Sequence, residues 1–227
     1  MQSKSIPKSN LAIFNTFKTR GDKFTGEAKR QRGIISHLAM EESPDRRTRT
    51  SIAHVIAEKN GLLWQNLYSG IFRDLDEVLI PLGIVREAGR LPLRRGPKAL
   101  QQEGIAYYEL TDAGLLVTAS LEELEDNRIK LLERYLSNHQ SDPDQKLLSE
   151  GILLLLKTAP SLVFKILKEY IISYSKGTAK ELVPMSVEKM RSVVADKISV
   201  ERELIEAFTT LPEDRKDTVC EFIRRIS

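Results

Sequence analysis

Side chains suited to contacts with nucleic-acid bases gather between residues 62 and 79. Gln65 and Asn66 carry amides that can form paired hydrogen bonds with adenine edges, and Arg73 can bind guanine or phosphate. Ser69 is small enough to allow a close approach. All four avoid the apolar positions that recur every three or four residues, so they fall on the outer side of an expected helix. An ordinary solvated helix face has the same composition, and that reading stays open.

A basic stretch between residues 86 and 98 contains a second group of side chains suited to nucleic acid. Arg90, Arg94, Arg95 and Lys98, together with Arg86, stand there against a single carboxylate, that of Glu87. Such a concentration of positive charge suits a phosphate backbone. Its Arg-Gly-Pro string is similar to basic strings that lie in narrow, electronegative minor grooves. The alternative is a solvated, mobile loop.

Residues that could support catalysis or bind a metal are scattered. His37, His54 and His139 have no metal-binding spacing with one another or with Cys220. The chain has no phosphate-cradling glycine loop, dinucleotide fingerprint or nucleophile elbow. Cys220 stands in an apolar helical context, which favours an inert thiol. We therefore expect no enzyme, no cofactor and no metal site.

Four aromatic residues raise the question of base stacking on single strands. They are Trp64, Tyr68, Tyr107 and Tyr108. Core packing is the favoured role for Trp64 and for one of the two consecutive tyrosines, because neighbouring residues of a strand face opposite sides.

The composition is that of a protein able to bury a core, with 41% hydrophobic and 30% charged residues in 227. The single cysteine and the lack of a signal-peptide pattern favour a reducing compartment, the cytoplasm. The most apolar run, 151–172, contains Pro160 and several charges, so we interpret it as two buried helices and expect no membrane segment. Residues 1–110 are net basic and residues 111–227 net acidic.

The order of the expected elements is informative. A short helix after a Ser9 cap and a helix from Thr25 to Met40 come first. The next helix begins at Ser43-Pro44 or near Thr50 and stops at Asn60-Gly61. A helix over 62–79 and two strands, 84–87 and 105–110, follow, with Ala88 to Gly104 between the strands and a closing helix capped by Thr111.

Three segments of this region carry a resemblance to a known family. They are Ser69-Gly-Ile-Phe-Arg-Asp-Leu75, Leu82-Gly-Ile-Val85 and Tyr107-Tyr-Glu-Leu-Thr-Asp-Ala-Gly114. In this order they resemble winged helix-turn-helix regulators, including MarR-like and PadR-like proteins, over about residues 25–121. The resemblance implies that the helix at 62–79 enters the major groove and that the hairpin loop reaches phosphates or the minor groove.

We therefore expect a mainly α fold: a winged helix-turn-helix with a small β-hairpin, then a long helix and an α-helical C-terminal region. The expected parts are a segment 1–24, helical or mobile, a winged domain with its long closing helix at 25–137, and a helical domain at 146–227 for association or partner contact. Helices are expected near 146–157, 161–175, 186–208 and 211–226. The stripe Leu121, Leu124, Leu131 and Tyr135 follows a roughly seven-residue pattern and motivates a homodimer.

The expected function is sequence-specific binding of double-stranded DNA by a transcriptional regulator. Its expected partners are duplex DNA, a second copy of the chain and a protein partner at the C-terminal helices. One alternative is a winged-helix protein–protein assembly module that binds no DNA. Another is a DNA-binding protein of replication or partition, which differs only in the site it recognises.

Overall fold

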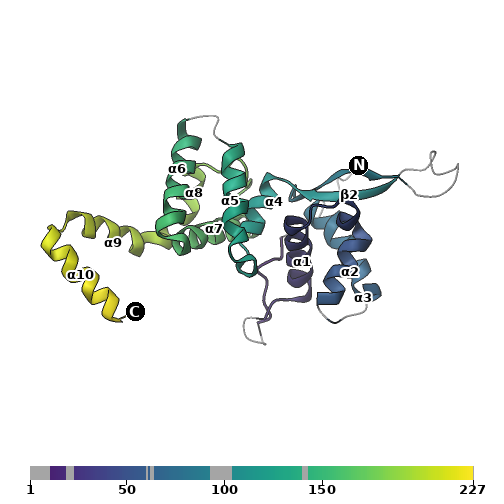
Figure 1. Cartoon of the computed structure of the whole chain (residues 1–227), viewed down its shortest axis with the longest axis horizontal. Coiled ribbons are helices and arrows are strands. Elements are labelled where there is room, and N and C mark those ends of the chain that lie inside the picture. The colour runs from purple at the N-terminus through teal and green to yellow at the C-terminus, as the bar shows by residue number, and fades with distance from the viewer. Residues whose placement is uncertain are drawn as a thin grey trace, which may run out of the picture.

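The computed structural model describes residues 11–18, 23–59, 61, 64–92, 104–139 and 143–226, without the side chains of Trp64, Asn66 and Ile226. The described chain is mainly helical and has a small antiparallel sheet of two strands. Figure 1 shows α1 to α3 and the strands at one end, α5 to α8 in the middle, and α9 and α10 at the other end. The N-terminal elements are α1 (Gly26–Met40), α2 (Arg49–Lys59), α3 (Trp64–Arg73), β1 (Val85–Leu91), β2 (Ile105–Leu110) and α4 (Asp112–Ala119). The C-terminal ones are α5 (Asn127–Asn138), α6 (Pro143–Thr158), α7 (Pro160–Ser175), α8 (Val187–Val194), α9 (Ser199–Thr210) and α10 (Glu213–Ile226).

The helices α1, α2 and α3 lie within the ranges where the sequence predicts helices, although α2 has a later start than one of the two expected. The Thr25 hydroxyl caps α1 by accepting a hydrogen bond from the Ala28 backbone N–H, at 3.1 Å. A short 3-10 turn, η1 (Pro44–Arg47), precedes α2. The helix therefore begins beside Thr50 and not at Ser43-Pro44. Apolar side chains of the three helices share one buried core, which contains Ile34, Ile35, Ile52, Ile56, Ile71 and Leu75.

The segment before α1 is not the helix that the sequence predicts. Leu11, Ala12 and Ile13 are buried in a non-helical stretch, and Thr16 forms an isolated antiparallel bridge with Phe24. The Ala12 backbone N–H donates to the side-chain oxygen of Gln31 at 2.8 Å. Tertiary burial and this hydrogen bond therefore override the local helical pattern. The predicted cap, Ser9, lies outside the described residues.

The hairpin is longer than its sequence pattern predicts. β1 continues to Leu91, which pairs with Ile105, so the strands include Ala88 to Leu91 and the expected separation from Ala88 to Gly104 is wrong. The register shifts between Glu87 and Gly89. A side chain at Gly89 would place its first carbon 2.8 Å from the Tyr107 hydroxyl oxygen, so glycine leaves room for that ring to lie against β1. Of the four aromatic residues, Tyr108 is buried and the Trp64 side chain lies outside the described part.

The expected long closing helix is broken into two. α4 ends at Ala119, a 3-10 turn η4 (Glu122–Leu124) follows, and α5 begins at Asn127. Glu125 takes a positive φ of 45°, which no continuous helix permits. The break turns the whole stripe inward, since its four members, Leu121, Leu124, Leu131 and Tyr135, are buried within this chain. The stripe therefore offers no face to a second copy, and this basis for a homodimer was wrong.

The C-terminal helices surround two buried tyrosines. The Tyr135 hydroxyl accepts a hydrogen bond from the Met185 N–H at 2.9 Å, and the Tyr170 hydroxyl donates to the Leu182 carbonyl at 3.1 Å. Burial raises the pKa of Tyr170 to about 12, so it stays a neutral donor. The helix expected near 186–208 is interrupted by a 3-10 turn, η5 (Ala195–Ile198), and α6 begins at Pro143, before the helix expected near 146–157.

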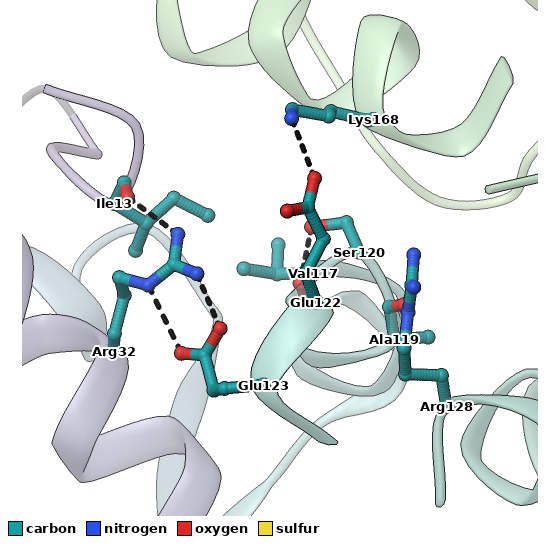
Figure 2. Close-up of polar contacts among 9 residues, drawn as sticks. All are labelled: Ile13, Arg32, Val117, Ala119, Ser120, Glu122, Glu123, Arg128 and Lys168. Carbon is teal, nitrogen blue, oxygen red and sulfur yellow. Dashed lines mark hydrogen bonds and ion pairs between the residues drawn. The ribbon is translucent and has the colours of Figure 1, made fainter. Parts of the chain in front are cut away.

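The turn η4 joins the two halves of the molecule through neighbouring carboxylates (Figure 2). Glu123 pairs with Arg32 of α1, whose guanidinium also donates to the Ile13 carbonyl at 3.0 Å. Glu122 accepts a hydrogen bond from Lys168 of α7 at 2.7 Å. Arg128 donates to the Ala119 carbonyl at 3.0 Å. This turn therefore links the N-terminal helices to the C-terminal bundle. None of the described helices has the length and apolarity needed to cross a bilayer.

Candidate nucleic-acid interface

Helix α3 presents a polar stripe to solvent. Gln65, Ser69 and Arg73 are exposed and follow one another at a spacing of four, which keeps them on one side of the helix. Ile71 and Leu75, on the other side, are fully buried. The ion pairs found among the described residues do not include Arg73, although its charge acts on the neighbouring Asp74 carboxylate. The predicted exposed stripe is therefore present for these three residues, while the side chain of Asn66 lies outside the described part.

The acidic residue next to this stripe is turned inward. Asp74 begins η2, a π-helical continuation of α3 over Asp74–Leu79, and its side chain is 0% exposed. The Arg30 guanidinium of α1 pairs with it, with 2.7 Å between Nε and Oδ2. Gly70 makes room for this arginine, because a side chain there would start 2.7 Å from the Arg30 Nε. Burial raises the pKa of Asp74, and Arg30 opposes that shift through its hydrogen bond and its charge.

A second arginine neutralises the next carboxylate. Arg49 of α2 pairs with Asp76, and its Nε donates to the buried Tyr108 hydroxyl at 2.6 Å. The guanidinium also lies over the Phe72 ring, 4.9 Å from its centre. Arg49 therefore ties α2, the end of α3 and β2 together. From the sequence, Asp74, Asp76 and Glu77 oppose deep insertion of this half of the helix. In the structure, Asp74 is buried and Asp76 is paired with Arg49.

The described part of the hairpin has less free positive charge than its sequence suggests. The Arg86 Nε donates to Glu109 at 2.7 Å, and the Arg90 Nε donates to Glu87 at 2.7 Å. Both pairs are exposed, and exposed pairs of this kind contribute little energy and exchange readily with other anions. Arg94, Arg95 and Lys98 lie outside the described residues. Of the predicted basic residues of the loop, only Arg90 can thus be placed.

Helix α3 and the hairpin lie at the same end of the molecule, away from α9 and α10 (Figure 1). Arg30 and Arg49, which hold α3 in place, are not among the residues predicted for the interface. Their partners are 44 and 27 positions away in the chain, so no local pattern marks them.

The described residues contain no group of three or more His, Cys, Asp or Glu side chains placed to hold a metal ion. Comparison of the chain with protein-family models, curated proteins and solved structures finds no match. The function of the chain is therefore inferred from its own geometry and charge.

Proposed function

We propose that the chain is a winged helix-turn-helix protein that binds double-stranded DNA sequence-specifically and regulates transcription. The observation that carries the proposal is the exposed stripe of Gln65, Ser69 and Arg73 on α3, a helix whose opposite side is anchored in the core. A major groove about 12 Å wide admits one α-helix, and these side-chain types match the hydrogen-bonding groups on base edges.

Each residue of the stripe has a distinct role in this proposal. The Gln65 amide donates to and accepts from one base edge, preferably that of adenine. The small Ser69 lets the helix backbone approach the groove floor. Arg73 reaches a guanine edge or a phosphate. The pairing of Asp74 with Arg30 and of Asp76 with Arg49 removes much of the repulsion between this helix and the DNA.

The hairpin supplies the backbone contacts. Arg90 exchanges Glu87 for a phosphate on binding, which an exposed ion pair permits at small cost. Arg94, Arg95 and Lys98 add charge next to it in the sequence and reach phosphates or the minor groove. The proposal requires neither a catalytic step nor a cofactor.

Selection of bound duplexes from a random-sequence library tests the proposal. We expect the wild-type protein to enrich one short motif, and Gln65→Ala to lose the preference at one position, by roughly 1–3 kcal/mol. Arg191→Ala, a change of an exposed residue on α8, serves as the control and keeps the motif. Enrichment of no motif by the wild-type protein would refute sequence-specific recognition.

One observation favours a second candidate, a protein–protein assembly module. Arg86 and Arg90 are both satisfied by carboxylates of their own hairpin, as expected for a surface that need not attract a polyanion. In that case the exposed side of α3 meets a protein. The absence of measurable duplex binding at low salt would favour this candidate, because phosphate contacts are strongest there.

A further inference from the structure

The C-terminal segment 199–226, here called the arm, is the least packed part of the described chain. It consists of α9 and α10 and projects from the bundle of α5 to α8 (Figure 1). None of its described side chains is buried. Five large apolar side chains of the arm are instead exposed by 47–72%: Val200, Leu204, Ile205, Phe222 and Ile223. Exposed apolar groups gathered in this way mark an interaction surface.

An open apolar hollow of about 450 Å³ lies between the two helices of the arm. Leu204, Ile205 and Phe208 of α9 line one side, and Val219 and Ile223 of α10 are among those lining the other. The helices have 12 and 14 residues, and helices of this length are only marginally stable in water without a packing partner. The arm therefore has the shape of half a helical bundle whose other half is missing from a single chain.

We infer that the arm of a second copy fills this hollow, so that two arms form a four-helix bundle about a two-fold axis. A two-fold arrangement covers the same apolar face on both copies at once. At roughly 100 Å² for each large apolar side chain, the five exposed ones bury on the order of 500 Å² per copy. The total, about 1,000 Å², reaches the size at which specific interfaces begin.

The charges of the arm determine which helices meet. α9 carries three glutamates and one arginine, with Glu201 paired to Lys165 of α7 and Glu206 to Arg202, and the structure shows no ion pair for Glu203 among the described residues. α10 has as many basic as acidic residues, but Arg224 and Arg225 gather in its last turn, where Arg225 pairs with Glu221. Contact between α9 of one copy and the last turn of the partner's α10 joins opposite charges, while contact between the two α9 helices joins like charges. The arms therefore pair α9 with the partner's α10. This association does not depend on DNA binding and can be tested without DNA.

Light scattering of the full-length protein at micromolar concentration tests the inference. We expect the wild type to have the mass of a dimer and the double variant Leu204→Glu with Ile223→Glu to have that of a monomer. The control is Leu154→Glu on α6, a leucine 65% exposed and outside the arm, which keeps the dimer. Circular dichroism with thermal unfolding reports whether each variant keeps the rest of its fold, since all three positions are exposed.

A monomeric wild type overturns the inference, as does a double variant that remains a dimer, or a control that dissociates as well. The pairing of α9 with α10 has its own test in Arg224→Glu with Arg225→Glu. These changes place like charges across the interface and raise the dissociation constant of the dimer roughly tenfold. An unchanged dissociation constant contradicts that pairing.

Discussion

The pair of Arg30 and Asp74 holds the end of α3 against α1, and its removal is the sharpest test of how this helix is positioned. Asp74 is completely buried, and Arg30 is its ion-pair partner. Arg30→Ala leaves a buried carboxylate without its counter-charge. The direct consequence is a loss of stability, because an isolated charge in a protein interior has lost its hydration without compensation.

The expected loss is about 3–5 kcal/mol in the free energy of unfolding at neutral pH, the cost of breaking a buried pair on one side. Arg30→Met with Asp74→Leu removes both charges and recovers most of that loss, since apolar residues of similar volume often replace a buried pair at little cost. Arg46→Ala is the control. Arg46 is 67% exposed in its pair with Glu41, and its loss costs less than about 1 kcal/mol.

The penalty also depends on pH, in a direction fixed by the raised pKa of Asp74. Its pKa lies above the ordinary value of 3.8 because burial disfavours the charged form, and removal of Arg30 raises it further. An acid with a raised pKa in the folded state costs stability as pH rises towards that pKa, and the cost disappears below the ordinary value. Arg30→Ala is therefore most destabilising at neutral pH and less so towards pH 3.8.

Denaturant unfolding of the wild type, the single variant, the double variant and the control, each at neutral and at acidic pH, measures these differences. A loss for Arg30→Ala as small as that of the control, with no dependence on pH, would show that the ion pair does not support α3. A double variant as unstable as the single one would show that the loss is due to packing and not to the uncompensated charge.

Three further predictions concern the hairpin loop, the contact of Arg49 with Tyr108, and two glycines. Arg94→Ala with Arg95→Ala weakens binding to every duplex and lowers the slope of log affinity against log salt by about 2; an unchanged slope would exclude both from phosphate contact. Arg49→Ala leaves a buried tyrosine hydroxyl without its donor and lowers the free energy of unfolding by about 1–3 kcal/mol, which calorimetry or denaturant titration can check. Gly83→Ala costs about 1–2 kcal/mol because its φ is 67°, whereas Gly151→Ala, within α6 and with open space around it, stabilises by up to about 1 kcal/mol; equal effects in the two thermal melts would contradict this reasoning.

Local sequence patterns predicted the elements that local interactions control. The helix expected from Thr25 to Met40 is present as α1, and the spacing of apolar residues in α3 identified Gln65, Ser69 and Arg73 as outward-facing. The break between α4 and α5 could not be predicted in this way. The turn there contains neither Gly nor Pro, and the residue with positive φ is Glu125, an unusual choice for that conformation.

The contacts that hold the candidate site in place could not be predicted from the sequence either. Arg30 follows Lys29 in a basic stretch and resembles a surface residue, yet it enters the interior because Gly70 and Asp74 on another helix receive it. Likewise, the sequence predicted a strongly positive hairpin because it did not reveal that Glu109, on the opposite strand, pairs with Arg86. Both depend on contacts between residues far apart in the chain, and a single sequence does not reveal these contacts.

The central claim, that the exposed side of α3 binds duplex DNA, is tested most directly by measuring duplex affinity between about 50 and 200 mM salt for the wild type, Arg73→Ala and the control Arg191→Ala. The account predicts a steep fall in affinity with salt for the wild type and the control. It predicts weaker binding by Arg73→Ala at every salt concentration. No duplex binding by the wild type at the lowest salt, or identical curves for all three proteins, would contradict it.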